Sequence, residues 1–205
     1  MRALKLFIGL LLAIVAVVVG GGLLLPDTVH VERSIAIDRP PAQIYQFLNG
    51  FQRFEEWSPW DKDFDPTTVV TLSGPPSGPG ARMDWKGEKS TGAQWITEVV
   101  ENRKIQVALD FGANGKATAA YVLEPSGAGT RVTWGFDSNF EGNLIGRWMG
   151  LMFDKWIGAD YEKGLAKMKQ VIEAEPPPAP VNADEAPAAE GETSAESTEP
   201  APAPV

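Results

Sequence analysis

The stretch KIQVALDF, residues 104–111, alternates apolar and polar side chains more clearly than the rest of the chain. Its apolar positions are Ile105, Val107, Leu109 and Phe111. Successive side chains of a β-strand point to opposite faces, so these residues share one face of a sheet. A strand with one apolar and one polar face is typical of an antiparallel sheet that is buried on one side and hydrated on the other.

Other stretches on both sides of this one also have the composition of strands. They cover residues 29–37, 67–73, 81–88, 93–100, 116–124 and 130–137. The segments between the later strands, such as GANG (112–115) and PSGAG (125–129), contain the glycine, asparagine and proline that hairpin turns require. The sequence therefore predicts a meander of about seven antiparallel strands.

Helical patterns flank this meander. After Pro40 and Pro41, the residues Ile44, Phe47 and Leu48 have the spacing of one helix face, and a second short helical piece ends at Trp57. The long stretch 143–174 reads as helix throughout, with Gly158 as a candidate hinge. Its apolar positions are Leu144, Trp148, Leu151, Met152, Leu165, Met168 and Ile172. A sheet with one apolar face needs a cover, and this helix is the element available, which predicts an α+β fold.

The amino-terminal segment differs in kind from this domain. Residues 6–25, LFIGLLLAIVAVVVGGGLLL, contain no charge, and a helix of this length spans about 30 Å, the thickness of a bilayer's hydrocarbon core. A cleaved secretory signal is the competing interpretation, but its apolar region is normally about 7–15 residues long and ends in a small-x-small cleavage site. No such site precedes Pro26, so we expect an uncleaved single-pass membrane anchor.

The charges around residues 6–25 predict the orientation of this anchor. Arg2 and Lys5 precede it, whereas Asp27, Glu32 and Arg33 follow it. Because basic residues stay on the cytoplasmic side, residues 1–5 are expected in the cytoplasm and the domain outside it, in the periplasm if the protein is bacterial. The chain has no cysteine, which excludes disulfides and thiolate metal sites.

The carboxy-terminal segment 174–205 has the composition of a disordered tail. It holds eight prolines and seven acidic residues without a basic or aromatic residue. Taking its seven negative charges from the chain's net charge of −9 leaves −2 for the remainder. A domain close to neutral does not indicate nucleic acid as a partner. The folded domain is therefore expected over residues 29–173.

The order of these elements is accompanied by recognisable local sequences. They are VERSIAIDRPPAQIYQFL (31–48), WSPW (57–60), SGPPSGPGARMDW (73–85) and GADYEKGLAKMK (158–169). With them the chain resembles the START-like (SRPBCC) superfamily, and within it the polyketide cyclase/dehydrase-type branch. The resemblance implies a helix-grip fold, in which a curved antiparallel sheet wraps around a long carboxy-terminal helix with an apolar cavity between them. It also implies binding of a lipid or another hydrophobic molecule, but no catalytic residue of the family maps onto this chain.

The stretch FEEWSPWDKDFDP, residues 54–66, combines two tryptophans with five carboxylates. Its Asp61, Asp63 and Asp65 have the spacing of an EF-hand calcium loop, but Pro66 and Leu72 stand where glycine and glutamate are needed. His30 is the only histidine, so zinc would lack its usual nitrogen and sulfur ligands. We therefore predict no metal and no cofactor, and we interpret the stretch as a hinge at the rim of the cavity.

Aromatic and methionine side chains are the best candidates for lining an apolar cavity. The candidate ligand-binding residues are Trp57, Trp60, Met83, Trp85, Glu98, Phe111, Tyr121, Trp134, Trp148 and Met152. Glu98 is included as a candidate buried acid, although Trp95 and Ile96 beside it leave the direction of its side chain open. The same residues would also suit a filled core, and the family resemblance favours a hollow one.

These observations predict a membrane-anchored domain that binds a hydrophobic small molecule or lipid in a cavity beneath the long helix. A polyketide cyclase or dehydratase is one alternative, and it would need an acid/base pair such as Glu98 and Tyr121 at the cavity. A non-catalytic membrane adaptor that uses its acidic tail is the other. The sequence does not specify the ligand or the oligomeric state.

Overall fold

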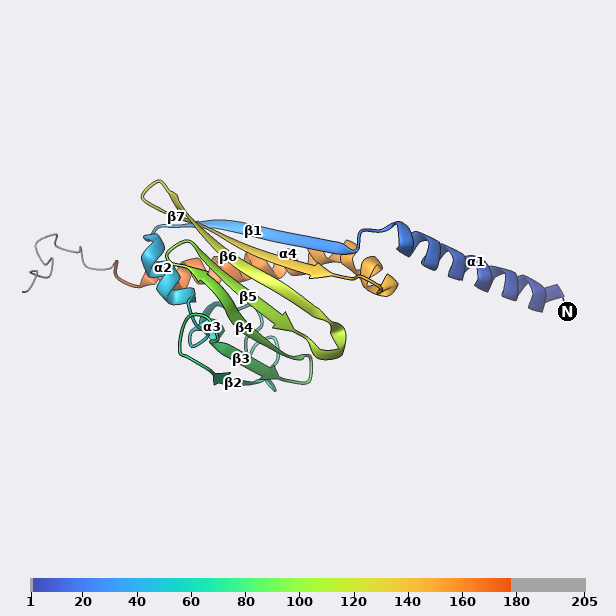
Figure 1. Cartoon of the computed structure of the whole chain (residues 1–205), viewed down its shortest axis with the longest axis horizontal. Coiled ribbons are helices and arrows are strands. Elements are labelled where there is room, and N and C mark those ends of the chain that lie inside the picture. Colours follow the sequence, from blue (N-terminus) through green and yellow to red (C-terminus); the bar gives the residue numbers. More distant parts are fainter. Residues whose placement is uncertain (1, 178–205) are drawn as a thin grey trace, which may run out of the picture.

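A computed structural model describes residues 2–177 of the chain (Figure 1). The elements are α1 (Arg2–Leu24), β1 (Thr28–Ile37), α2 (Pro41–Leu48), α3 (Phe54–Trp57), β2 (Val69–Ser73), β3 (Arg82–Lys86), β4 (Thr91–Val100), β5 (Lys104–Asp110), a 3-10 turn η1 (Gly112–Asn114), β6 (Lys116–Ser126), β7 (Gly129–Asn139) and α4 (Leu144–Ala174). Every predicted strand and helix is present, with boundaries moved by a few residues.

The strands form one antiparallel sheet in the order β1-β7-β6-β5-β4-β3-β2. From β2 to β7 each strand pairs with its neighbour in the chain, as expected for hairpin turns rich in glycine and asparagine. β1 closes the other edge beside β7, where Thr28 lies opposite Asn139 and Ile37 opposite Thr130. The end of the sheet that carries Thr28 and Asn139 is next to α1, and we call it the α1 end.

One face of this sheet is buried against α4, as the alternation of residues predicted. Along β6 the buried residues are Ala117, Ala119, Tyr121 and Leu123, each separated by a more exposed one. From α4 the residues that face them are Tyr161, Leu165, Met168 and Ile172, at helical spacing and each no more than 2% exposed. The fold is therefore the predicted helix-grip arrangement of a curved sheet and a long carboxy-terminal helix (Figure 1).

The two halves of α4 differ in their contacts. Gly158, expected as a hinge, lies within an uninterrupted helix and is buried against the guanidinium group of Arg33. Its missing side chain permits this contact, and Arg33 then forms ion pairs with Asp154 at 3.0 Å and Glu162 at 2.8 Å. The expected apolar stripe holds for the carboxy-terminal half of α4, but Trp148 in the other half does not face the sheet.

α1 extends away from the domain (Figure 1) and is long and apolar enough to cross a membrane. Its side chains are almost all exposed, as expected for a helix that has no protein core around it. The predicted acidic tail lies, apart from its first residues, outside the described part of the chain.

Candidate functional site

A column of aromatic rings fills the middle of the space between the sheet and α4. Trp134 of β7 stacks on Tyr161 of α4, with ring centroids 3.7 Å apart and planes at 8°. Tyr121 of β6 stacks on the same indole at 5.6 Å, and Trp57 of α3 meets it edge-on at 5.1 Å. Such stacked and edge-to-face pairs stabilise a core by about 0.5–1.5 kcal/mol each beyond their buried area.

This column contains one buried polar atom without a hydrogen-bond partner among the described residues. The indole Nε1 of Trp134 is buried and has no hydrogen-bond partner among the described residues. Burial raises the pKa of Tyr121 and of Tyr161 well above its ordinary value, so both phenols stay neutral. A neutral phenol or indole in an apolar environment can donate a hydrogen bond to an oxygen of a bound molecule. The site thus combines apolar surface with a few polar groups, as small-molecule sites do.

Trp60 covers this column from the solvent side. It is 37% exposed and meets Trp134 at 5.9 Å and Tyr161 at 6.2 Å. It is carried by the segment 57–66, which connects α3 to the sheet and which we call the rim segment. Trp60 therefore shields the rings of Trp134 and Tyr161 from solvent on this side.

Ion pairs and capping hydrogen bonds hold the rim segment in place. Lys167 of α4 donates a hydrogen bond to Asp61 at 2.7 Å, and this contact is the main cause of the lowered pKa of Asp61. Asp65 is buried and accepts hydrogen bonds from the backbone and hydroxyl of Thr67 and the backbone of Lys89. Led by the Thr67 hydroxyl, these bonds lower the pKa of Asp65 to about 2. Both acids therefore stabilise loop structure, and no group of acidic or histidine residues in the described chain is arranged for a metal ion.

The buried face of the sheet is more open at its α1 end. Trp85 and Phe111 lie there in edge-on contact at 5.9 Å, and both are half-buried. Gly92 opposite Trp85 leaves space for the indole ring, since a side chain at this position would lie 2.5 Å from it. Met83 and Gln94 continue this surface inward and are buried. A partly exposed apolar surface thus leads from the α1 end toward the aromatic column.

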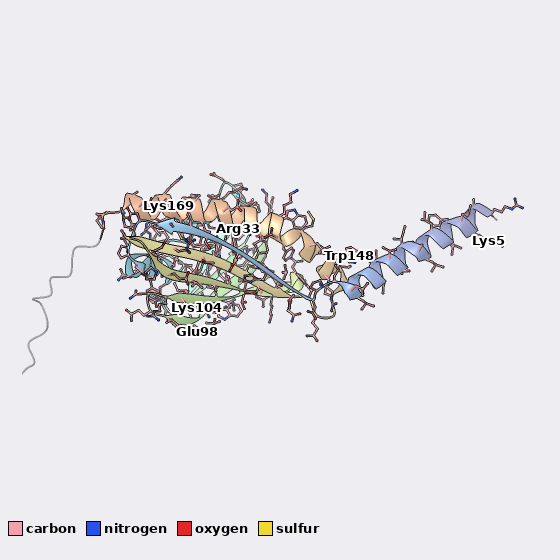
Figure 2. All side chains as sticks on the ribbon, turned by 90° about the horizontal axis from the view of Figure 1, so that it is seen from above. Lys5, Arg33, Glu98, Lys104, Trp148 and Lys169 are labelled. Atoms are coloured by element: carbon pink, nitrogen blue, oxygen red, sulfur yellow. The ribbon has the colours of Figure 1, made fainter. Side chains whose placement is uncertain are left out.

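Glu98 lies on the opposite face of the sheet. A bulge between Ile96 and Glu98 shifts the register of β4, and Glu98 then pairs with Gln106 on the outer face. Figure 2 shows it on the side of the sheet away from α4, where it is exposed. The two candidate acid/base residues, Glu98 and Tyr121, are therefore on different faces and cannot act on one substrate.

His30 is exposed near the start of β1. Its Nδ1 lies 2.7 Å from Asp137 and its Nε2 lies 3.3 Å from Glu32. The hydrogen bond to Asp137 is the main cause of its raised pKa. The residue belongs to a surface charge cluster with Glu32 and Asp137.

A depression of about 640 Å³ lies on the outer face of β3, β4 and β5. Its charged side chains include Arg82 and Asp84, which form an ion pair at 2.6 Å, and Asp110. The guanidinium group of Arg82 also lies over the ring of Trp95, 5.3 Å from its centroid. This depression is wide and polar, and none of the predicted cavity residues except Phe111 contributes to it.

The structure thus brings together most of the predicted site and separates the rest. Trp57, Trp60, Met83, Trp85, Phe111, Tyr121 and Trp134 belong to the buried face or its cover. Trp148 and Met152, which were expected to face the sheet, are instead 37% and 39% exposed on the far side of α4. Tyr161 was missed, although its spacing of four residues before Leu165 on the apolar stripe placed it on the buried face.

Comparison with known proteins agrees with this architecture. Residues 28–173 match the family described as polyketide cyclase / dehydrase and lipid transport. No curated protein sequence matches the chain significantly.

Solved structures share the fold at low sequence identity. A protein of unknown function from Staphylococcus aureus has a TM-score of 0.55 at 14% identity, covering 72% of this chain and 94% of its own. A protein from Mycobacterium smegmatis has a TM-score of 0.51 at 16% identity, covering 72% and 93%. The di-domain aromatase/cyclase StfQ of the steffimycin biosynthetic pathway has a TM-score of 0.53 at 11% identity, and the match covers 72% of this chain and 51% of StfQ. With the helix-grip fold and a family match over nearly the whole domain, the chain belongs to the polyketide cyclase / dehydrase and lipid transport family of the START-like superfamily.

Proposed function

We propose that this protein is a membrane-anchored binding protein for a hydrophobic small molecule or lipid. The ligand occupies the face of the sheet that is covered by α4, and it enters from the α1 end. The observation that carries the proposal is the buried and unpartnered Nε1 of Trp134 between two neutral phenols in an apolar surrounding. A buried donor without a partner costs about 1–3 kcal/mol, and a ligand oxygen would recover this energy.

In this proposal α1 anchors the protein in the bilayer. The link from Leu24 to Thr28 is only a few residues long, so the domain lies at the membrane surface. The half-buried Trp85 and Phe111 are at the end of the sheet nearest to α1, which gives a membrane-derived molecule a short path to the aromatic column. Residues 1–5 remain in the cytoplasm in this arrangement, and the domain is extracytoplasmic.

Binding is favoured over catalysis by the position of the acids. A cyclase or dehydratase needs a proton donor and a proton acceptor within reach of one substrate. The buried face offers neutral phenols, whereas Glu98 is on the outer face. The adaptor alternative rests on a tail that lies outside the described residues, and no contact in the described chain favours it.

The experiment is extraction of bound hydrophobic molecules from the purified full-length protein. We expect a lipid-sized compound at close to one equivalent, detected by native mass spectrometry and by chromatography of a solvent extract. Leu109→Trp fills the open end of the buried face and should remove the compound. Ala108→Trp, on the outer face of the same strand, is the matched control and should retain it.

Loss of the compound from both variants, or its absence from the wild-type protein together with failure to bind a fluorescent fatty acid, would contradict the proposal. A thermal melt of each variant establishes that it is folded. Retention by Leu109→Trp would place the ligand elsewhere on the molecule.

A further inference from the structure

The amino-terminal half of α4 presents an apolar surface that the protein does not cover. It consists of Ile145, Trp148, Met149, Met152 and Trp156, and we call it the α4 stripe. These side chains are between 37% and 69% exposed. Their spacing of three and four residues places them on one side of the helix. An exposed apolar patch of this kind marks an interaction surface.

An adjacent side of this half of α4 faces the domain. Gly146 and Gly150 lie against the ring of Phe140, which would meet a side chain at Gly150 at 3.1 Å. Phe153 follows on the same side and contacts Phe140 with ring centroids 5.5 Å apart. The helix is therefore apolar on both sides in this region, as helices are when they are buried or in contact with a membrane.

The α4 stripe lies directly beside α1. The Nε1 of Trp148 donates a hydrogen bond to the backbone oxygen of Val18 at 3.0 Å. The same indole lies against Gly21, where a side chain would come within 2.6 Å of it, and Leu144 packs on Gly22. Figure 2 shows Trp148 where α4 meets α1. The glycines let the two helices approach closely, as small residues do between helices in membranes.

This contact fixes the depth of the α4 stripe relative to the anchor. Val18 precedes Leu24, the last residue of α1, by about 9 Å along the helix axis. Trp148, which is hydrogen-bonded to Val18, therefore lies deeper along α1 than the end of that helix at Leu24. Arg147, the residue before Trp148, reaches back to the oxygen of Leu25 at 3.1 Å and to Asp27 at 3.7 Å, at the end of α1 where headgroups would be.

We infer that the α4 stripe inserts into the interfacial layer of the bilayer beside α1, so that the protein contacts the membrane through two elements. Tryptophan is enriched in that layer, and a helix with one apolar side can lie in its plane. The charges on α4 agree with this depth, because the same side of the helix turns polar at Asp160 and Lys163, which pair at 3.4 Å. A second copy of the chain could also cover an apolar stripe, but the bond from Trp148 to Val18 favours lipid as the occupant.

The inference rests on the anchor of the proposed function, and it adds an orientation to it. Two membrane contacts hold the domain at a fixed tilt, whereas one contact followed by a short link would leave the domain free to rotate. The tilt keeps the α1 end of the sheet, with Trp85 and Phe111, close to the lipid surface.

The absence of cysteine allows a direct test by single labels. Met149→Cys and Trp156→Cys in the full-length protein carry the environment-sensitive dye NBD in vesicles of phosphatidylcholine and phosphatidylglycerol. Val15→Cys in α1 is the control for the bilayer, and Lys163→Cys is the control on the same side of α4 beyond the stripe. We expect the emission of NBD at positions 149 and 156 to be blue-shifted. Doxyl-labelled lipid should quench it to an extent comparable with the quenching of NBD at position 15. Emission at 163 should be quenched by aqueous iodide instead.

Each other outcome would contradict either the insertion of the α4 stripe or the membrane anchor. If the label at position 15 is in lipid but the labels at 149 and 156 are quenched by iodide, the α4 stripe does not insert, and the membrane anchor is still supported. If 15 is also in water, the anchor of the proposed function fails. If 149 and 156 are shielded from both quenchers, a protein surface covers the stripe and the bilayer is not its occupant.

Discussion

At the scale of single residues, the site depends on positions where a side chain is absent as much as on those where one is present. Gly164 of α4 is buried where Trp134 and Pro59 approach the helix. A side chain at this position would lie 2.9 Å from the indole ring and 3.0 Å from the proline ring. The glycine thus lets the aromatic column and the rim segment pack on the same turn of α4.

Gly164→Ala is expected to destabilise the protein despite the higher helix propensity of alanine. Alanine gains about 1 kcal/mol in a helix, but overpacking of a rigid core costs about 1–3 kcal/mol. We expect a net loss of about 1 kcal/mol, measured by chemical denaturation of the reconstituted protein. Lys163→Ala on the exposed side of the helix is the control, with little change expected. A more stable Gly164→Ala variant would show that the column is not tightly packed here.

At the scale of secondary-structure elements, α4 combines roles that change along its length. Its carboxy-terminal half fills the concave face, its middle holds β1 through the ion pairs of Arg33, and its amino-terminal half meets α1. The rim segment is attached to it through Lys167 and Asp61. Because Trp60 belongs to the rim segment, this attachment also holds Trp60 over the aromatic column.

Asp61→Asn should loosen the rim segment without unfolding the domain. The change removes the charged partner of Lys167, and an ion pair this close to the surface is worth about 0.2–1 kcal/mol. Faster hydrogen exchange is expected at the backbone amides of residues 60–65, measured by mass spectrometry. Lys163→Ala again serves as the control on α4, and unchanged exchange at the rim segment would contradict the role of this ion pair.

The same ion pair predicts a dependence on pH. The pKa of Asp61 is lower in the folded protein than its ordinary value of 3.8, so its contribution is complete above that value and is lost as pH falls through the folded pKa. Wild-type exchange at the rim segment should therefore approach that of Asp61→Asn only in acid.

At the scale of the whole molecule, α1 extends from one end of the elongated domain (Figure 1). In the proposed arrangement the membrane is at this end of the molecule. The concave face has its more open end toward α1. This arrangement suits a protein that takes up a molecule from the lipid and holds it beside the membrane.

Labelling from outside the cell tests the predicted orientation. A single cysteine at Glu98, which is exposed on the outer face of the sheet, should react with a membrane-impermeant maleimide in intact cells, or in spheroplasts if an outer membrane is present. A cysteine at Ala3, before the span, should react only after lysis, because the proposed topology, based on Arg2 and Lys5, places this end in the cytoplasm. In intact cells, labelling at position 3 without labelling at position 98 would show that the topology is the reverse of the one predicted.

The sequence by itself determined the order and type of the elements, the buried face of the strands that alternate clearly, and the apolar span. These features follow from local periodicity and turn chemistry, as in KIQVALDF, where neighbouring residues along one strand specify the buried face. Membership of the family was also readable, because it depends on the order of several short motifs.

Only the tertiary structure decided where the ambiguous side chains point. The bulge after Ile96 sent Glu98 outward, and the packing of Gly146 and Gly150 on Phe140 left Trp148 to contact α1. Tyr161 completed the aromatic column only when α4 crossed the sheet at Trp134. Helical spacing gives the angular position of a residue around the helix axis. Which residue it contacts depends on how separate elements pack in space.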